Sequence, residues 1–179
     1  MKNSFKKTFV FFAAIIFILS FTYPKTVNAE KNLSGFKPND IRPKILKDYL
    51  DKHSSPLAEN AKDFVESADT FDLDWRLVVS IAGVESTFGK FIPTNSYNAW
   101  GWGVYGNNVI YFSSWKEGIE TVSKGLRENY INKMETANVY HIGRWYAASP
   151  TWASRVEYFM NKIAELQSDK AIYNLSISL

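Results

Sequence analysis

The stretch VVSIAGVES, residues 78–86, decides the fold. Its apolar residues recur three and four positions apart, which predicts a helix with one face turned to the core. Glu85 ends this run on the same side as Val78, Ile81 and Ala82. A face that buries valine and isoleucine does not ordinarily end in a carboxylate. We therefore predict a partly buried Glu85 at the mouth of a cleft, where a carboxyl group can act as a general acid.

The segments on either side of this stretch also have helical spacing. Capping residues support two of the predicted helices: Ser54-Ser55-Pro56 suits a first turn, and Ser114 with Glu117 has the spacing of a capping box. Asp72 or Asp74 is expected to cap the helix that carries Glu85. The helices predicted from apolar periodicity cover, approximately, residues 43–52, 57–68, 115–130, 139–147 and 151–163.

Between residues 89 and 112 the pattern changes. Gly101, Gly103 and Gly106 interrupt any helix, while the aromatic and β-branched residues around them favour extended structure, with residues 106–108 as a turn. The predicted fold class is therefore mainly α with a small β part: a helical domain with a β-hairpin lobe after the helix of Glu85. Aromatic rings beside a carboxylate suit a sugar, although they can equally form the core of a small lobe.

Residues 1–29 have the pattern of an export signal. Three lysines precede an apolar run over residues 9–21, and residues 27–29 supply the small side chains that a signal peptidase recognises. At about 1.5 Å per residue the run would span roughly 20 Å, less than the roughly 30 Å hydrocarbon core of a bilayer. We predict a cleaved signal peptide and a protein secreted to the cell envelope, with an uncleaved membrane anchor as the alternative. A linker and short helix over residues 30–54 and a folded domain over residues 55–170 would follow.

Composition excludes several classes of function. Four of the 21 Lys/Arg residues lie in residues 1–29, which contain none of the 18 Asp/Glu residues, so cleavage would leave 17 basic side chains against 18 acidic ones. No basic cluster then indicates a nucleic-acid partner. The chain has no cysteine, and His53 and His141 are not at a metal-ligand spacing. We predict no metal site, no cofactor and a monomer.

Four motifs occur in an order that resembles the glucosaminidase family of peptidoglycan hydrolases, within the lysozyme-like superfamily. They are ESTFGK at residues 85–90, NAWG at 98–101, FSSWKEGI at 112–119 and YAASP at 146–150. The resemblance implies a lysozyme-like helical domain acting on peptidoglycan glycan strands. This chain departs from the family's pattern at Ser149-Pro150 and Trp152-Ala153, where Asp-Pro and Tyr-Ala are frequent.

The resemblance also implies roles for individual residues. Glu85 falls on the family's catalytic acid, and Tyr146 falls on a tyrosine that lines the cleft and assists catalysis. Asn98 and Trp100 fall on the segment that shapes the sugar site. The predicted substrate-binding residues are Ser86, Asn98, Trp100, Trp102 and Tyr105.

No Asp or Glu occurs between Glu85 and Glu117, whereas most glycosidases use two carboxylates about 5–10 Å apart. Three mechanisms remain: the substrate's N-acetyl group acts as nucleophile, the muramic acid 6-hydroxyl attacks as in a lytic transglycosylase, or a remote acid such as Glu117 or Asp74 takes part. We favour the first. The predicted function is an endo-β-N-acetylglucosaminidase-like peptidoglycan hydrolase; the alternatives are a lytic transglycosylase or a wall-binding module without turnover.

Overall fold

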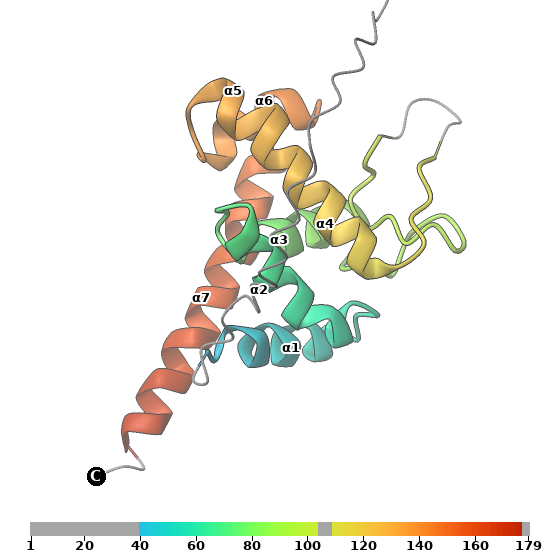
Figure 1. Ribbon diagram of the computed structural model, residues 1–179. Helices are drawn as coiled ribbons and strands as arrows, with labels where there is room; N and C mark the ends of the chain where they lie inside the picture. Colours follow the sequence, from blue (N-terminus) through green and yellow to red (C-terminus); the bar gives the residue numbers. More distant parts are fainter. Residues whose placement is uncertain (1–39, 104–108, 177–179) are drawn as a thin grey trace, which may run out of the picture. The chain divides into compact units, whose positions relative to one another are not determined.

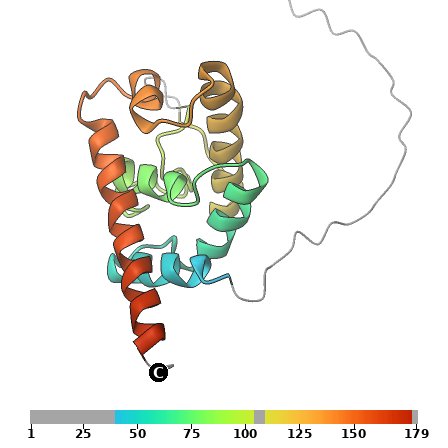
Figure 2. The same ribbon diagram turned by 90° about the vertical axis from the view of Figure 1, so that its left-hand side faces the viewer.

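Helix α3, Leu77–Ser86, lies at the centre of the fold in the computed structural model, which describes residues 40–103 and 109–176. Residues 77–83 are all buried, because α3 packs against both α7 (Trp152–Ser176) and α4 (Trp115–Gly125). Figure 2 shows the green α3 between the red α7 and the yellow-brown α4. The helix predicted from residues 78–86 is confirmed, but it is buried all round and not only on one face.

The remaining helices pack on α3, on the helices that contact it or on one another, and the prediction of a mainly helical domain is confirmed (Figure 1). All of them belong to one unit, residues 34–179. The chain after α4 continues directly into a π-helical segment and a short α-helix, and the π-helical segment contacts α6. The elements besides α3, α4 and α7 are α1 (Arg42–Lys52), η1 (Ala58–Asn60), α2 (Ala61–Thr70), η2 (Leu126–Ile131), α5 (Asn132–Met134) and α6 (Val139–Tyr146).

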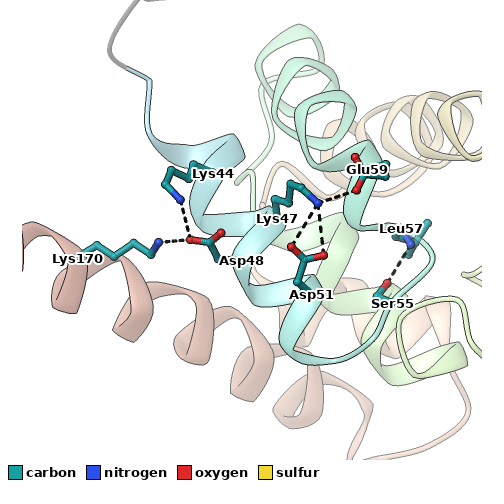
Figure 3. A network of polar contacts seen from close by, with 8 residues as sticks. All are labelled: Lys44, Lys47, Asp48, Asp51, Ser55, Leu57, Glu59 and Lys170. Carbon is teal, nitrogen blue, oxygen red and sulfur yellow. Dashed lines mark hydrogen bonds and ion pairs between the residues drawn. The ribbon is translucent and has the colours of Figure 1, made fainter.

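Helix α1 belongs to the helical domain and not to a linker. Its side chains Ile45, Leu46 and Leu50 are fully buried, and the helix contacts both α2 and α7. Polar contacts tie its outer face to its neighbours: Lys47 pairs with Glu59 of η1 at 2.7 Å, and Asp48 pairs with Lys170 of α7 (Figure 3). The short helix predicted within residues 30–54 is therefore packed on the helices that follow it.

The predicted β-hairpin is wrong: in the described residues 40–103 and 109–176 no residue belongs to a strand. The Asn98 side chain forms hydrogen bonds with backbone groups that would pair with each other in a β-ladder. Its Nδ2 donates to the carbonyls of Trp102 (2.9 Å) and Ile110 (3.1 Å), and its Oδ1 accepts from the Trp102 N–H at 2.9 Å. Gly101 and Gly103 have positive φ, which a regular strand does not allow. The insert is a loop organised around one side chain.

Three predictions fall on residues outside the described part of the chain: the signal peptide at residues 1–29, the turn at residues 106–108, and Tyr105. The predicted linker is also mostly outside it. In the part that the structure describes, no helix combines the length and the apolar character needed to cross a membrane.

Candidate active site

Glu85 lies in the last turn of α3, where the helix leaves the core. Its side chain is exposed, so the prediction of a partly buried carboxyl group is wrong. The helix ends immediately afterwards, because Thr87 is left-handed (φ 53°) and the Phe88 N–H bonds back to the Ala82 carbonyl at 3.0 Å. One carboxyl oxygen, Oε1, accepts a 2.6 Å hydrogen bond from the indole N–H of Trp152. The short bond fixes the carboxyl group, although solvent reaches it.

Trp152 is the site residue that sequence reasoning missed. It begins α7 and is only 2% exposed, and its ring stacks on Tyr146 with centroids 4.8 Å apart and planes at 26°. Gly143 of α6 makes room for the indole, since a Cβ atom at Gly143 would lie 2.9 Å from Trp152 Cε3. A buried indole N–H requires an acceptor, which is the only signal that the sequence offered.

Tyr146 ends α6 and lies beside the Glu85 carboxyl group. Its hydroxyl donates to the Trp100 carbonyl at 2.9 Å. Burial raises the pKa of Tyr146 well above its ordinary value, and the nearby Glu85 and Tyr130 raise it further. Tyr146 is therefore a neutral phenol at physiological pH. The structure thus brings together the two residues predicted to be catalytic, through contacts with Trp152.

Ser86, Asn98 and Trp100 are buried, and their side chains bond backbone groups next to the site. The Ser86 hydroxyl lies 2.7 Å from the Ala99 carbonyl and accepts from the Gly89 N–H at 2.9 Å. Trp100 donates its indole N–H to the Val78 carbonyl of α3 at 2.9 Å. These bonds attach the loop around Asn98 to α3. These three residues have a positioning role in the structure, and the substrate contacts predicted for them stay a prediction.

Trp102 is the predicted binding residue that remains partly exposed. Its ring centroid lies 6.1 Å from that of Tyr146 and 6.3 Å from that of Tyr130. Trp102 packs against Gly125 of α4, where a Cβ atom would lie 2.6 Å from Trp102 Cη2. Beside it is an open cavity of about 670 Å³. The residues that line this cavity are Trp102, Gly103, Asn129, Tyr130, Lys133, Met134 and Trp145.

Glu85 is not one of the lining residues of this cavity. Aromatic rings connect the cavity to Glu85. Trp102 and Tyr130 of the cavity wall both contact Tyr146, and Tyr146 stacks on Trp152, which binds Glu85. Trp145 of α6 also lines this cavity and is 75% exposed. The acid and the cavity are therefore neighbouring parts of one aromatic surface, and Tyr130 and Trp145 join Trp152 as residues that the sequence did not assign to the site.

The two remote acids considered from sequence have structural partners. Ser114 accepts from the Glu117 N–H at 3.2 Å, and the Glu117 carboxylate accepts from the Ser113 N–H and hydroxyl, each at 2.6 Å. The predicted N-cap role of Ser114 is confirmed, whereas the Glu117 carboxylate bonds Ser113 and not the Ser114 N–H that a capping box would use. These bonds lower the pKa of Glu117. Asp74 accepts from the Arg76 N–H at 2.9 Å and pairs with its guanidinium at 2.5 Å, at the start of α3.

The arrangement as a whole provides one fixed carboxyl group, one neutral phenol and a wall of aromatic rings. In residues 40–103 and 109–176 no group of three or more His, Cys, Asp or Glu side chains is placed to hold a metal ion. No protein-family model matches the chain, and no curated protein matches it either. Chemically, such a site can donate a proton to a ligand that stacks on aromatic side chains.

Proposed function

We propose that this protein is an exported peptidoglycan hydrolase that cleaves β-1,4 glycosidic bonds with Glu85 as its general acid. The observation that carries the proposal is the 2.6 Å hydrogen bond from the Trp152 indole to Glu85 Oε1. That bond orients the carboxyl group and leaves Oε2 available for proton transfer to a ligand. The order of the four motifs, which resembles that of the glucosaminidase family, supports the same function.

In the proposed reaction Glu85 donates its proton to the glycosidic oxygen as the bond from that oxygen to C1 breaks. The carbonyl oxygen of the substrate's own N-acetyl group forms the new bond to C1, which gives an oxazolinium intermediate. Water then attacks C1 and reopens this ring, and the Glu85 carboxylate takes a proton from that water. Glu117 and Asp74 already have structural partners, which favours the N-acetyl group over a remote acid.

Tyr146 serves the proposed reaction as a neutral dipole. Its proton is already donated to the Trp100 carbonyl, and its raised pKa keeps it from acting as a phenolate nucleophile. The lone pairs of its oxygen are positioned in advance, so they can stabilise positive charge that develops at C1 without reorganisation. The stacked Trp152 ring holds this geometry.

The test is the release of soluble fragments from purified cell walls by Glu85→Gln protein. Glutamine keeps the shape of the side chain and removes the proton, so we expect the rate to fall by about 100-fold or more. Glu120→Gln is the matched control, because Glu120 is an exposed glutamate on α4, and it should retain the wild-type rate. A Glu85→Gln variant that releases fragments as fast as the wild type would refute the proposed role.

Mass spectrometry of the fragments identifies the bond that is cut. New reducing N-acetylglucosamine ends support the proposed glucosaminidase, and reducing muramic acid ends indicate a muramidase. Ends of 1,6-anhydromuramic acid indicate a lytic transglycosylase. Binding of the wild-type protein to walls without any release indicates a wall-binding module on this fold.

A further inference from the structure

The lining of the aromatic cavity beside Trp102 includes a positively charged side chain. Lys133 lines the cavity together with Asn129 and the rings of Trp102, Tyr130 and Trp145. The Lys133 ammonium lies 3.4 Å from Asn129 Oδ1, and no acid among the described residues forms an ion pair with it. The cavity therefore combines flat apolar faces, an amide and a positive charge that the described part of the protein does not neutralise.

The charge pattern along the helical run sets Lys133 apart. Upstream, on α4, the lysines have acids four residues later: Lys116 lies 3.9 Å from Glu120, and Lys124 lies 4.0 Å from Glu128. Both pairs are exposed, and in each pair the glutamate neutralises the charge of the lysine. The neighbour of Lys133 on its own face is Asn129, four residues earlier, which carries no charge. Within residues 40–103 and 109–176, no acid compensates the positive charge of Lys133 where the helix borders the cavity.

A π-helical segment precedes this position. Residues of η2 and α5 line the cavity as neighbours on one side of the helical run: Asn129 and Tyr130 come from η2, and Lys133 and Met134 come from α5. Segments of π-helix occur frequently at functional sites. The cavity volume of about 670 Å³ also lies within the roughly 300–1,000 Å³ of small-ligand sites.

We propose that this cavity is a subsite for a saccharide unit that bears a carboxylate, with the sugar on the aromatic rings and the carboxylate on Lys133. The inference rests on the proposed function and specifies its substrate: an acidic glycan is preferred over an uncharged one. In peptidoglycan the carboxylate can come from the lactyl arm of muramic acid or from the stem peptide. The chemistry required of Lys133 is the same for both.

The experiment measures binding by titration calorimetry, in the Glu85→Gln background so that no probe is cleaved. The probes are chitotetraose, which is uncharged, a peptide-free tetrasaccharide of alternating N-acetylglucosamine and N-acetylmuramic acid, and the same tetrasaccharide with stem peptides. Lys133→Met keeps most of the aliphatic length and removes the charge. Lys124→Met is the matched control, because Lys124 is an exposed lysine of α4 outside the cavity.

We expect Lys133→Met to weaken binding of the charged probes about two- to fivefold, the range for an exposed ion pair, because Lys133 is exposed. Chitotetraose binding should not change, and Lys124→Met should change none of the three. Raising the salt from about 20 mM to about 300 mM should remove the difference between Lys133→Met and its parent. A loss with the peptide-free tetrasaccharide identifies the lactyl carboxylate, and a loss only with the peptide-bearing probe identifies the stem peptide.

Two results would overturn the inference: equal losses for chitotetraose and the charged probes, or no loss for any charged probe. Neither result bears on Glu85, whose role is decided by fragment release with Lys133 intact. Conversely, a wild-type protein that releases no fragments but shows the charge-selective effect of Lys133→Met would refute the proposed hydrolase and leave the acidic-glycan subsite in place.

Discussion

Trp152→Phe isolates the hydrogen bond that holds Glu85. Phenylalanine keeps an aromatic ring that can stack on Tyr146, as Trp152 does at 4.8 Å, but it removes the indole N–H that donates to Glu85 Oε1 at 2.6 Å. In the proposed reaction Glu85 begins as a neutral acid and becomes a carboxylate as its proton leaves. The indole N–H therefore interacts more strongly with the transition state than with the ground state.

The size of the effect follows from that difference. A hydrogen bond to a charged group contributes about 1.5–3 kcal/mol and one to a neutral group about 0.5–1.5 kcal/mol. The differential stabilisation is therefore about 1–1.5 kcal/mol, which corresponds to a kcat about five- to twelvefold lower in Trp152→Phe. KM should stay unchanged, because Trp152 is a positioning residue that acts through Glu85 and its bond strengthens only in the transition state.

The assay is fragment release at several concentrations of solubilised glycan strands, so that kcat and KM are obtained separately. Trp152 is buried, so the smaller ring should also cost about 1–2 kcal/mol of unfolding free energy, which urea denaturation measures. Trp75→Phe is the control, because Trp75 is partly buried and precedes α3, at the opposite end of that helix from Glu85. It should lose stability and keep its kcat.

Folded Trp152→Phe protein that retains the wild-type kcat would refute the role assigned to this hydrogen bond. An equal loss of kcat in Trp75→Phe would refute it as well, because the loss would then follow stability and not the hydrogen bond. A rise in KM at constant kcat would place Trp152 in substrate binding instead.

Two further predictions concern stability. Asn98→Ala removes the side-chain donor that bonds the Trp102 carbonyl at 2.9 Å and the Ile110 carbonyl at 3.1 Å. We expect the free energy of unfolding, measured in urea, to fall by about 2 kcal/mol. A free energy equal to that of the wild type would contradict the assigned role of Asn98. The hydrogen bond from Lys170 lowers the pKa of Asp48, so this pair stabilises the fold above the unfolded-state pKa and loses its effect as the pH falls through the folded-state pKa. Lys170→Met should therefore be less stable than wild type at pH 6, and the difference should shrink below about pH 4; a difference that is constant from pH 6 to pH 3 would exclude the linkage.

The helices could be predicted because their signals are local. Apolar spacing fixes which face of α2, α4 and α6 is buried, and the N-cap hydrogen bond from the Glu117 N–H to Ser114 joins residues only three apart. The prediction failed at the insert because Asn98 competes with the backbone for hydrogen bonds. Its partners are Trp102 and Ile110, and no alternation of aromatic and polar residues distinguishes such a loop from a hairpin.

The candidate site was predictable in part. Glu85 stood out as a carboxylate at the end of an apolar helix, and the resemblance to a family pointed to Tyr146. Trp152 could not be assigned, because it lies 67 residues from Glu85 and only the packing of α7 against α3 brings the two together. The exposure of Glu85 was also missed. Helical periodicity predicts which face of a helix is buried, but it does not predict how exposed the end of the helix is.

The position of Glu85 at the end of a buried helix explains why the proposed reaction relies on the substrate. Helix α3 carries no other acid, and the loop that follows is anchored by the neutral side chains Ser86, Asn98 and Trp100. The two acids considered from the sequence have partners beside helix starts: the Glu117 carboxylate accepts from the Ser113 N–H before α4, and Asp74 binds Arg76 before α3. Moving either one would leave a backbone N–H just before a helix, that of Ser113 or that of Arg76, without its acceptor. A second carboxylate would therefore be gained at the expense of the scaffold that holds the first, whereas the acetamide of the glycan enters with the substrate and requires no rearrangement of the protein.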